Sequence, residues 1–205
     1  MATKHKISLR KPAAFSLVEL LVVITIMLLL INFTSLGLNQ VLKGMRIEQA
    51  GRLIMDEINL ARQIAVARNL NVELRLIHKD RAGGTNGVFY CLQSGVRSKS
   101  GDGAFTPVSR LAQLPDGMAM ATNATLSSLI GSQVKSTSTN PAYSYVAVII
   151  RPTGNLEPAA GLPLNQPWFV TAVPENKLGA GVTAIDNFVT VQIDPWTARP
   201  TAYRP

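Results

Sequence analysis

The sequence is poor in the residues that most often carry catalysis and metal binding. It has one cysteine, Cys91, and two histidines, His5 and His78, in 205 residues. A single cysteine excludes an intrachain disulfide, so the hydrophobic core must stabilise the fold. No Cys/His or Ser/His/Asp set can be assembled, a zinc site lacks ligands, and no phosphate-binding glycine motif occurs. We therefore expect a protein that is not an enzyme and has no cofactor, catalytic residue or metal ligand.

Charged residues are missing from one long stretch near the start of the chain. From Leu20 to Leu42 there is no Asp, Glu, Lys or Arg. A helix rises about 1.5 Å per residue, so about 20 residues cross the roughly 30 Å hydrocarbon layer of a membrane. We expect residues 15–42 to form a transmembrane helix. Because Lys and Arg are abundant before this stretch, its N-terminal end is expected in the cytoplasm and the rest of the chain outside it.

Proline is absent between Pro12 and Pro107, so nothing forces the helix to end at residue 42. Residues 43–69 are predicted to continue it as an amphipathic segment, giving one helix from about Phe15 to Arg68. Small and aliphatic residues recur there at three- and four-residue steps, which predicts a face that packs on a core. That face comprises Ile47, Ala50, Gly51, Ile54, Ile58, Ala61 and Ala65. The polar face comprises Arg46, Glu48, Arg52, Asp56, Glu57, Arg62 and Arg68.

After Asn69 the pattern changes to the two-residue alternation that is typical of strands. The predicted strands are 72–77, 88–92, 108–114, 118–120, 143–151, 168–173, 188–193 and 201–203, with a turn at Leu114 to Gly117. The segment 122–142 is rich in Ser, Thr, Asn and Gly and is predicted to be an exposed, flexible loop. The predicted fold class is α+β: the N-terminal helix packs on an antiparallel sheet domain formed by residues 70–205.

The net charge of +8 raises the question of nucleic-acid binding. Half of it comes from four basic residues among the first 12, so the rest of the chain is only mildly basic. A DNA-binding surface around the first hairpin remains an alternative, with nucleic acid the less favoured partner; it would use Arg75, Lys79, Arg81, Arg97, Lys99 and Arg110. Three loop aspartates, Asp80, Asp186 and Asp194, lack the spacing of a calcium site, and turn or capping roles are favoured.

The stretch Phe15-Ser16-Leu17-Val18-Glu19-Leu20-Leu21 follows a short basic leader and precedes the apolar run. This combination resembles the class III signal of type IV pilins and type II secretion pseudopilins. Weaker similarities extend further. The Arg151 to Gly154 turn, the Leu114 to Gly117 turn and the segment from Val191 to Arg199 resemble minor pseudopilins of the H type. The chain also resembles the pilin-like group called "Verru_Chthon cassette protein D".

The resemblance implies a processing pathway. A prepilin peptidase would cut between Ala14 and Phe15, releasing the leader 1–14, and would N-methylate Phe15. The family usually has Gly before the cut, where this chain has Ala14. Glu19 would pair with the amino terminus of a neighbouring subunit, because a buried carboxylate is tolerated when a cation matches it. The implied protein is a structural subunit of a type IV pilus or type II secretion-like pseudopilus. Its partners would be the prepilin peptidase, other pilin-like subunits and the bacterial inner membrane, with its C-terminal domain periplasmic.

Two alternatives remain open for the N-terminal segment. A Sec signal peptide would be cut after the small residues Ser35-Leu36-Gly37, although the apolar run is long for one and contains Glu19. A plain signal-anchored, extracytoplasmic binding protein, including a DNA-binding one as in competence pseudopilins, would keep its leader. The sequence does not distinguish secretion, adhesion, motility and DNA uptake, nor a major from a minor subunit.

Overall fold

The computed structural model describes residues 16–80, 87–98, 104–131, 133, 136–139, 142–158, 162–179 and 185–204. Within them, the side chains of residues 33–41, 139 and 142 are not described. The leader 1–14 and the predicted cleavage site at Ala14 and Phe15 lie outside the described residues. The chain divides into two compact units, Met1–Leu42 and Lys43–Pro205.

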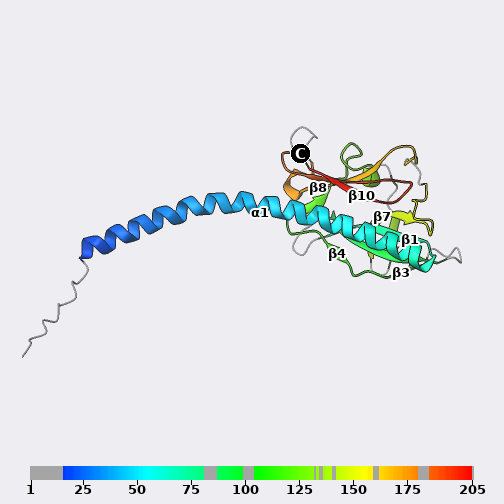
Figure 1. Cartoon of the computed structure of the whole chain (residues 1–205), viewed down its shortest axis with the longest axis horizontal. Helices are drawn as coiled ribbons and strands as arrows, with labels where there is room; N and C mark the ends of the chain where they lie inside the picture. The colour runs from blue at the N-terminus through cyan, green and yellow to red at the C-terminus, as the bar shows by residue number, and fades with distance from the viewer. Residues whose placement is uncertain are drawn as a thin grey trace, which may run out of the picture. The chain divides into compact units, whose positions relative to one another are not determined.

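One long helix, α1 (Leu17–Arg68), contributes residues to both units (Figure 1). It ends where the sequence predicted, at Arg68. The next residue, Asn69, has a φ of 52°, in the left-handed region that Asn tolerates better than most residues. The Leu70 N–H then donates to the carbonyl of Ala65 at 3.2 Å, which closes a Schellman-type cap. A change of backbone hand at Asn69 therefore ends the helix without any proline.

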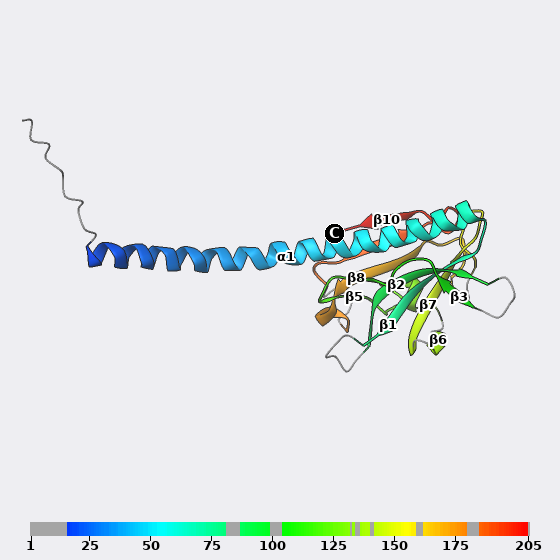
Figure 2. The ribbon, with the colours of Figure 1, turned by 90° about the horizontal axis from the view of Figure 1, so that it is seen from below.

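In the second unit, the part of α1 from residue 43 to 68 lies along one face of the sheet (Figure 2). The predicted core face of this segment is confirmed, because all seven of its residues are buried. Gly51 permits a close approach of the helix to the sheet, since a Cβ there would stand 2.8 Å from a methyl group of Val189. The core contains Trp168, Phe89 and the aliphatic side chains of the central strands together with this helix face.

The second unit contains one ten-stranded sheet, and every strand pairing recorded in it is antiparallel. This confirms the α+β class with an antiparallel sheet. Its order is β10-β9-β8-β5-β2-β1-β7-β6, with β3 and β4 also paired to β2. The strands are β1 (Val72–Lys79), β2 (Val88–Arg97), β3 (Phe105–Pro107), β4 (Ala112–Gln113), β5 (Met118–Met120), β6 (Ser136–Thr139), β7 (Ala142–Ile150), β8 (Trp168–Pro174), β9 (Val189–Ile193) and β10 (Pro200–Tyr203).

The predicted single strand at 108–114 is wrong, because two short strands flank a bend at Ser109. The N–H groups of Val108 and Ser109 both donate to the carbonyl of Ser94, at 2.9 and 3.1 Å. Two consecutive residues that face one partner residue form a bulge. This bulge interrupts the pairing with β2 and separates β3 from β4. Leu111 is exposed as a result, whereas Leu114 reaches the core.

Two predicted turns are confirmed by their backbone hydrogen bonds. The Met118 N–H donates to the carbonyl of Pro115 at 3.0 Å, and the Gly154 N–H donates to that of Arg151 at 2.8 Å. Gly117 and Gly154 have φ values of 77° and 82°, which glycine adopts at little cost. The first turn leads directly into β5, as the sequence predicted.

The predicted loop at 122–142 is exposed at residues 122–125, but the prediction is wrong further along the segment. It contains a short helix, α2 (Ser128–Gly131), and β6, and Leu126, Leu129 and Ile130 are buried. Side chains and backbone of this segment bond to β8: the Thr171 N–H donates to Ser127 Oγ at 2.9 Å and the Phe169 N–H donates to Ser128 Oγ at 2.9 Å. The Ser-rich composition that suggested flexibility therefore supplies hydroxyl groups that fix the segment to the sheet.

Candidate functional site

The first candidate site is the start of α1, where Ser16 and Glu19 cap the helix. The Val18 N–H donates to Ser16 Oγ at 3.3 Å, and the Ser16 N–H donates to Glu19 Oε2 at 3.4 Å. This is the reciprocal arrangement of a capping box, which satisfies backbone donors that the first helical turn leaves free. Our sequence reasoning missed this role for Glu19, although Ser-x-x-Glu before an apolar run is its known signal.

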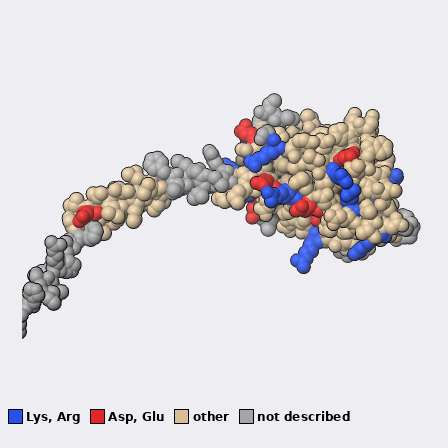
Figure 3. Space-filling model, in the orientation of Figure 1, with Lys and Arg blue, Asp and Glu red and all other residues tan. Residues whose placement is uncertain are grey.

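The described surface of α1 from Leu17 to Ile31 is mostly apolar. Thirteen large apolar side chains between Leu17 and Ile31 are exposed, from 41% for Val23 to 78% for Leu17. Glu19 is the only charged residue between residues 16 and 42. Figure 3 shows a single acidic patch, surrounded by uncharged atoms, on the described part of this unit. Within the residues that the structure describes, no helix has the length and apolar character needed to cross a membrane.

Glu57 was predicted on the exposed polar face of α1, and this prediction is wrong, because the residue is only 7% exposed. Its Oε1 accepts a hydrogen bond from Ser94 Oγ on β2 at 2.7 Å and another from Ser109 Oγ. Ser109 Oγ in turn accepts the Ser94 N–H at 2.8 Å. The bulge between β3 and β4 thus brings Ser109 to the carboxylate. Burial of Glu57 is tolerated because these hydroxyl groups satisfy it, and they tie the helix to the sheet.

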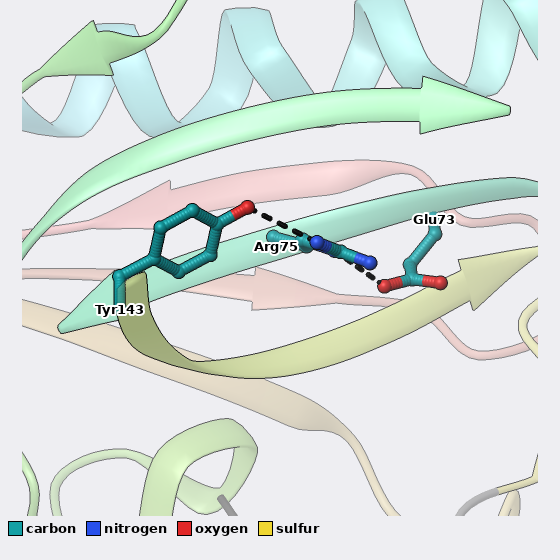
Figure 4. Close-up of polar contacts among 3 residues, drawn as sticks. All are labelled: Glu73, Arg75 and Tyr143. Atoms are coloured by element: carbon teal, nitrogen blue, oxygen red, sulfur yellow. Dashed lines mark hydrogen bonds and ion pairs between the residues drawn. The ribbon is translucent and has the colours of Figure 1, made fainter. Parts of the chain in front are cut away.

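A second polar cluster surrounds Arg75 on β1 (Figure 4). The Nε of Arg75 donates to Glu73 Oε1 at 2.7 Å, and Nη1 donates to the hydroxyl of Tyr143 at 3.0 Å. The guanidinium carbon lies 3.7 Å from the centre of the Phe105 ring and 4.0 Å from that of the Tyr145 ring. Arg75 is therefore paired with a carboxylate and placed against two aromatic rings, an arrangement that suits guanidinium better than an ammonium group.

The charge state of this cluster is fixed by its neighbours. Burial by itself lowers the pKa of Arg75, but the hydrogen bonds to Glu73 and Tyr143 and the charge of Glu73 outweigh it, so the pKa is raised. Arg75 and Glu73 are each 5% exposed. Arg75 therefore cannot belong to the basic surface considered for DNA binding. Of the other residues of that surface, Lys79 and Arg110 are exposed, Arg97 is half-buried, and Arg81 and Lys99 lie outside the described residues.

Cys91 and His78, the residues considered for catalysis that the structure describes, lie on neighbouring strands, where Ile77 pairs with Cys91 and His78 with Phe89. Cys91 is a reduced thiol buried in β2, and His78 on β1 packs edge-on against Phe89 at a ring distance of 5.0 Å. Over the described ranges, no three His, Cys, Asp or Glu side chains are grouped so as to hold a metal ion. Asp194 has the predicted turn role, since its carboxylate accepts the Trp196 N–H at 3.0 Å and the Thr197 hydroxyl at 2.7 Å.

Comparisons with known proteins do not extend this description. No protein-family model, no curated protein and no solved structure matches the chain.

Proposed function

We propose that this chain is a pilin-like structural subunit and not an enzyme. A prepilin peptidase cuts it between Ala14 and Phe15 and methylates the new amino terminus. The mature subunit then assembles through its N-terminal helix into a type IV pilus or a type II secretion-like pseudopilus. Before assembly it is held in the bacterial inner membrane by a single span within residues 15–42, with residues 43–205 outside the cytoplasm.

The observation that carries this proposal is the apolar surface of α1 around one carboxylate. A helix that is apolar on all sides is stable in water only when lipid or other helices cover it. Both covers are available to a pilin-like subunit: lipid before assembly and the helices of neighbouring subunits afterwards. The uncharged run of the sequence from Leu20 to Leu42 supports the same reading.

Glu19 supports assembly in preference to simple anchoring. A carboxylate within an apolar setting costs about 2.5 to 3.5 kcal/mol or more at the centre of a membrane, so an anchor gains nothing from it. Its one hydrogen bond recorded in the described residues, from the Ser16 N–H, leaves the negative charge without a cation. The methylated amino terminus of a neighbouring subunit would supply that cation. Pairing would then set the axial position of each added subunit, because a subunit out of step leaves a charge unpaired.

The mature N-terminus tests this proposal directly. The full-length chain is expressed with and without a prepilin peptidase, and the membrane-bound product is analysed by N-terminal sequencing and intact mass. We expect a peptidase-dependent start at Phe15 with the mass of one added methyl group. A start near Leu38 would identify a Sec signal peptide, and an uncut Met1 in the presence of an active peptidase would identify a plain anchor; either result rejects the proposal. A known prepilin processed in the same cells serves as the positive control.

A further inference from the structure

The second unit contains a cavity of about 670 Å³ beside the first turn of its helical segment. Its walls come from α1, from the turn before β5, from the 3₁₀ helix η1 (Glu175–Lys177) after β8, and from residues 185–187. Ile47, Met118 and Ile185 form an apolar wall and are each at most 7% exposed. The cavity thus has an apolar base that is continuous with the core.

Charges of both signs surround this apolar wall in equal number. Three cationic side chains, Lys43, Arg46 and Lys177, and three carboxylates, Asp116, Glu175 and Asp186, line the cavity. A purely anionic ligand would meet the three carboxylates, and a purely cationic ligand would meet the three cations. The lining is therefore complementary to a ligand that carries one charge of each sign.

Lys43 and Arg46 are placed to bind the negative end of such a ligand. They stand three residues apart on a helix, so their side chains share one face, and Ile47 on that face reaches the core. No ion pair within 4 Å is recorded for either of them in the part of the chain that the structure describes. Asp186 is exposed and has no recorded ion pair there, whereas Asp116 and Glu175 already interact with other residues, so Asp186 is the carboxylate available for the positive end.

The position of Lys43 in the chain indicates where the ligand comes from. Lys43 directly follows Leu42, the last residue of the uncharged run, and Arg46 follows about 4.5 Å further along the helix. If that run lies in the hydrocarbon layer, as the proposed function requires, Lys43 and Arg46 lie at the level of the lipid head groups. The inference rests on that part of the proposed function.

We propose that this cavity binds the head group of a zwitterionic phospholipid with a primary ammonium, a phosphoethanolamine lipid. Lys43 and Arg46 bind the phosphate, and Asp186 accepts hydrogen bonds from the ammonium group. The apolar wall at Ile47, Met118 and Ile185 contacts the glycerol region. Bound lipid would hold the unassembled subunit at a fixed depth, and release of the lipid would accompany its entry into a filament.

Native mass spectrometry of the full-length chain in a neutral detergent tests this site. Phosphatidylethanolamine, phosphatidylcholine and phosphatidylglycerol with identical acyl chains are added at equal concentration, and free phosphoethanolamine is tested separately. We expect phosphatidylethanolamine to be retained about fivefold better than the other two lipids, the effect of one or two exposed ion pairs. Arg46→Gln should weaken retention of all phospholipids. Asp186→Asn should remove the preference for phosphatidylethanolamine.

Arg52→Gln is the matched control, because Arg52 lies on the same helix, is exposed, pairs with Glu48 and is not part of the cavity wall. It should retain lipids as the unchanged protein does. Equal retention of the three lipids, a preference for phosphatidylglycerol, or an unaltered preference in Asp186→Asn would overturn the inference. Binding of free phosphoethanolamine without retention of the lipid would overturn the membrane source. Carbonate extraction of cell membranes distinguishes failure of the proposed function from failure of the lipid site. A protein that is absent from the extracted membranes contradicts the proposed function. A protein that is inserted but shows no lipid preference contradicts only the lipid site.

Discussion

The ring of Phe105 occupies the space directly above Gly95, where any other residue would place its side chain. A Cβ on Gly95 would overlap the Phe105 ring and would stand 2.7 Å from the carbonyl of Thr106. The same ring lies 3.7 Å from the guanidinium of Arg75. Because Gly95 on β2 has no side chain, Phe105 on β3 can cover the buried charge of Arg75 on β1.

Gly95→Ala should destabilise the second unit. The new methyl group must displace Phe105 or the backbone of β3, and overpacking of this kind costs about 1 to 3 kcal/mol. Urea unfolding of the full-length chain in detergent, followed by fluorescence of the buried Trp168, measures the change. Gly179→Ala is the control, because a Cβ there meets nothing within 4 Å. Equal stability of the two variants would contradict the proposed contact.

Arg75→Met should cost about 3 to 5 kcal/mol of unfolding free energy, because it leaves the buried carboxylate of Glu73 without its cation. Adding Glu73→Gln removes that charge, and the double variant should be more stable than Arg75→Met alone. A double-mutant cycle on the same unfolding assay gives the interaction energy, for which about 0.5 to 3 kcal/mol is expected. Strict additivity of the two substitutions would show that the residues do not interact.

The pH dependence of this pair follows from the raised pKa of Arg75. A group whose folded pKa is raised contributes its stability fully below its unfolded pKa and loses it only as the pH rises through the folded value. For Arg75 that loss lies in strongly alkaline solution. In a Glu73→Gln background, which has no buried carboxylate beside Arg75, the destabilisation caused by Arg75→Met should therefore be the same at about pH 6 and about pH 9. A clear difference between these two conditions would show that another titrating group controls the cluster.

Glu57→Ala should cost about 1.5 to 3 kcal/mol, since it removes two hydrogen bonds to a charged acceptor and leaves the hydroxyls of Ser94 and Ser109 without it. Asp56→Ala is the control: Asp56 precedes Glu57 on α1 but is exposed, so its replacement should change stability by no more than about 0.5 kcal/mol. The same unfolding assay compares them. Similar effects of the two substitutions would mean that the carboxylate does not tie helix to sheet.

Glu57 and Ser109 also show where reading of the sequence succeeds and where it stops. Repetition along α1 correctly predicted the buried face from Ile47 to Ala65, because helical periodicity depends only on local spacing. It placed Glu57 among exposed residues because a charged side chain is usually solvated. The partners that make its burial tolerable lie 37 and 52 residues away, and the bulge that brings Ser109 to it has no local signal.

In the sheet, too, local features were predicted correctly and contacts between distant segments were not. Alternation and turn residues correctly predicted β1, β5 and the two glycine turns, all of which depend on neighbouring residues. Arg75 alternates correctly with Leu74 and Leu76, but alternation does not reveal that Phe105 and Tyr145 cover it. The bonds from β8 to Ser127 and Ser128 likewise join distant segments, so the composition of residues 126–130 did not reveal that they pack on the sheet.

Glu19 has two roles to separate, its cap on α1 and the proposed charge pairing between subunits. Glu19→Gln retains a side-chain oxygen that can accept the Ser16 N–H, since Gln also serves in capping boxes, but it removes the charge. Ser16→Ala keeps the charge and removes the hydroxyl that accepts the Val18 N–H, at a cost of about 0.5 to 2 kcal/mol in helix stability.

If charge pairing drives assembly, Glu19→Gln should insert in the membrane and be cut before residue 15, yet enter filaments at least about tenfold less than the unchanged subunit, the effect of about 1.4 kcal/mol. Ser16→Ala should enter them nearly normally. Immunoblots of sheared filaments and of membrane fractions, from cells expressing each variant beside the native filament components, give the two fractions. The reverse order, with Ser16→Ala impaired and Glu19→Gln normal, would mean that Glu19 serves only as a helix cap and would remove the basis for intersubunit pairing.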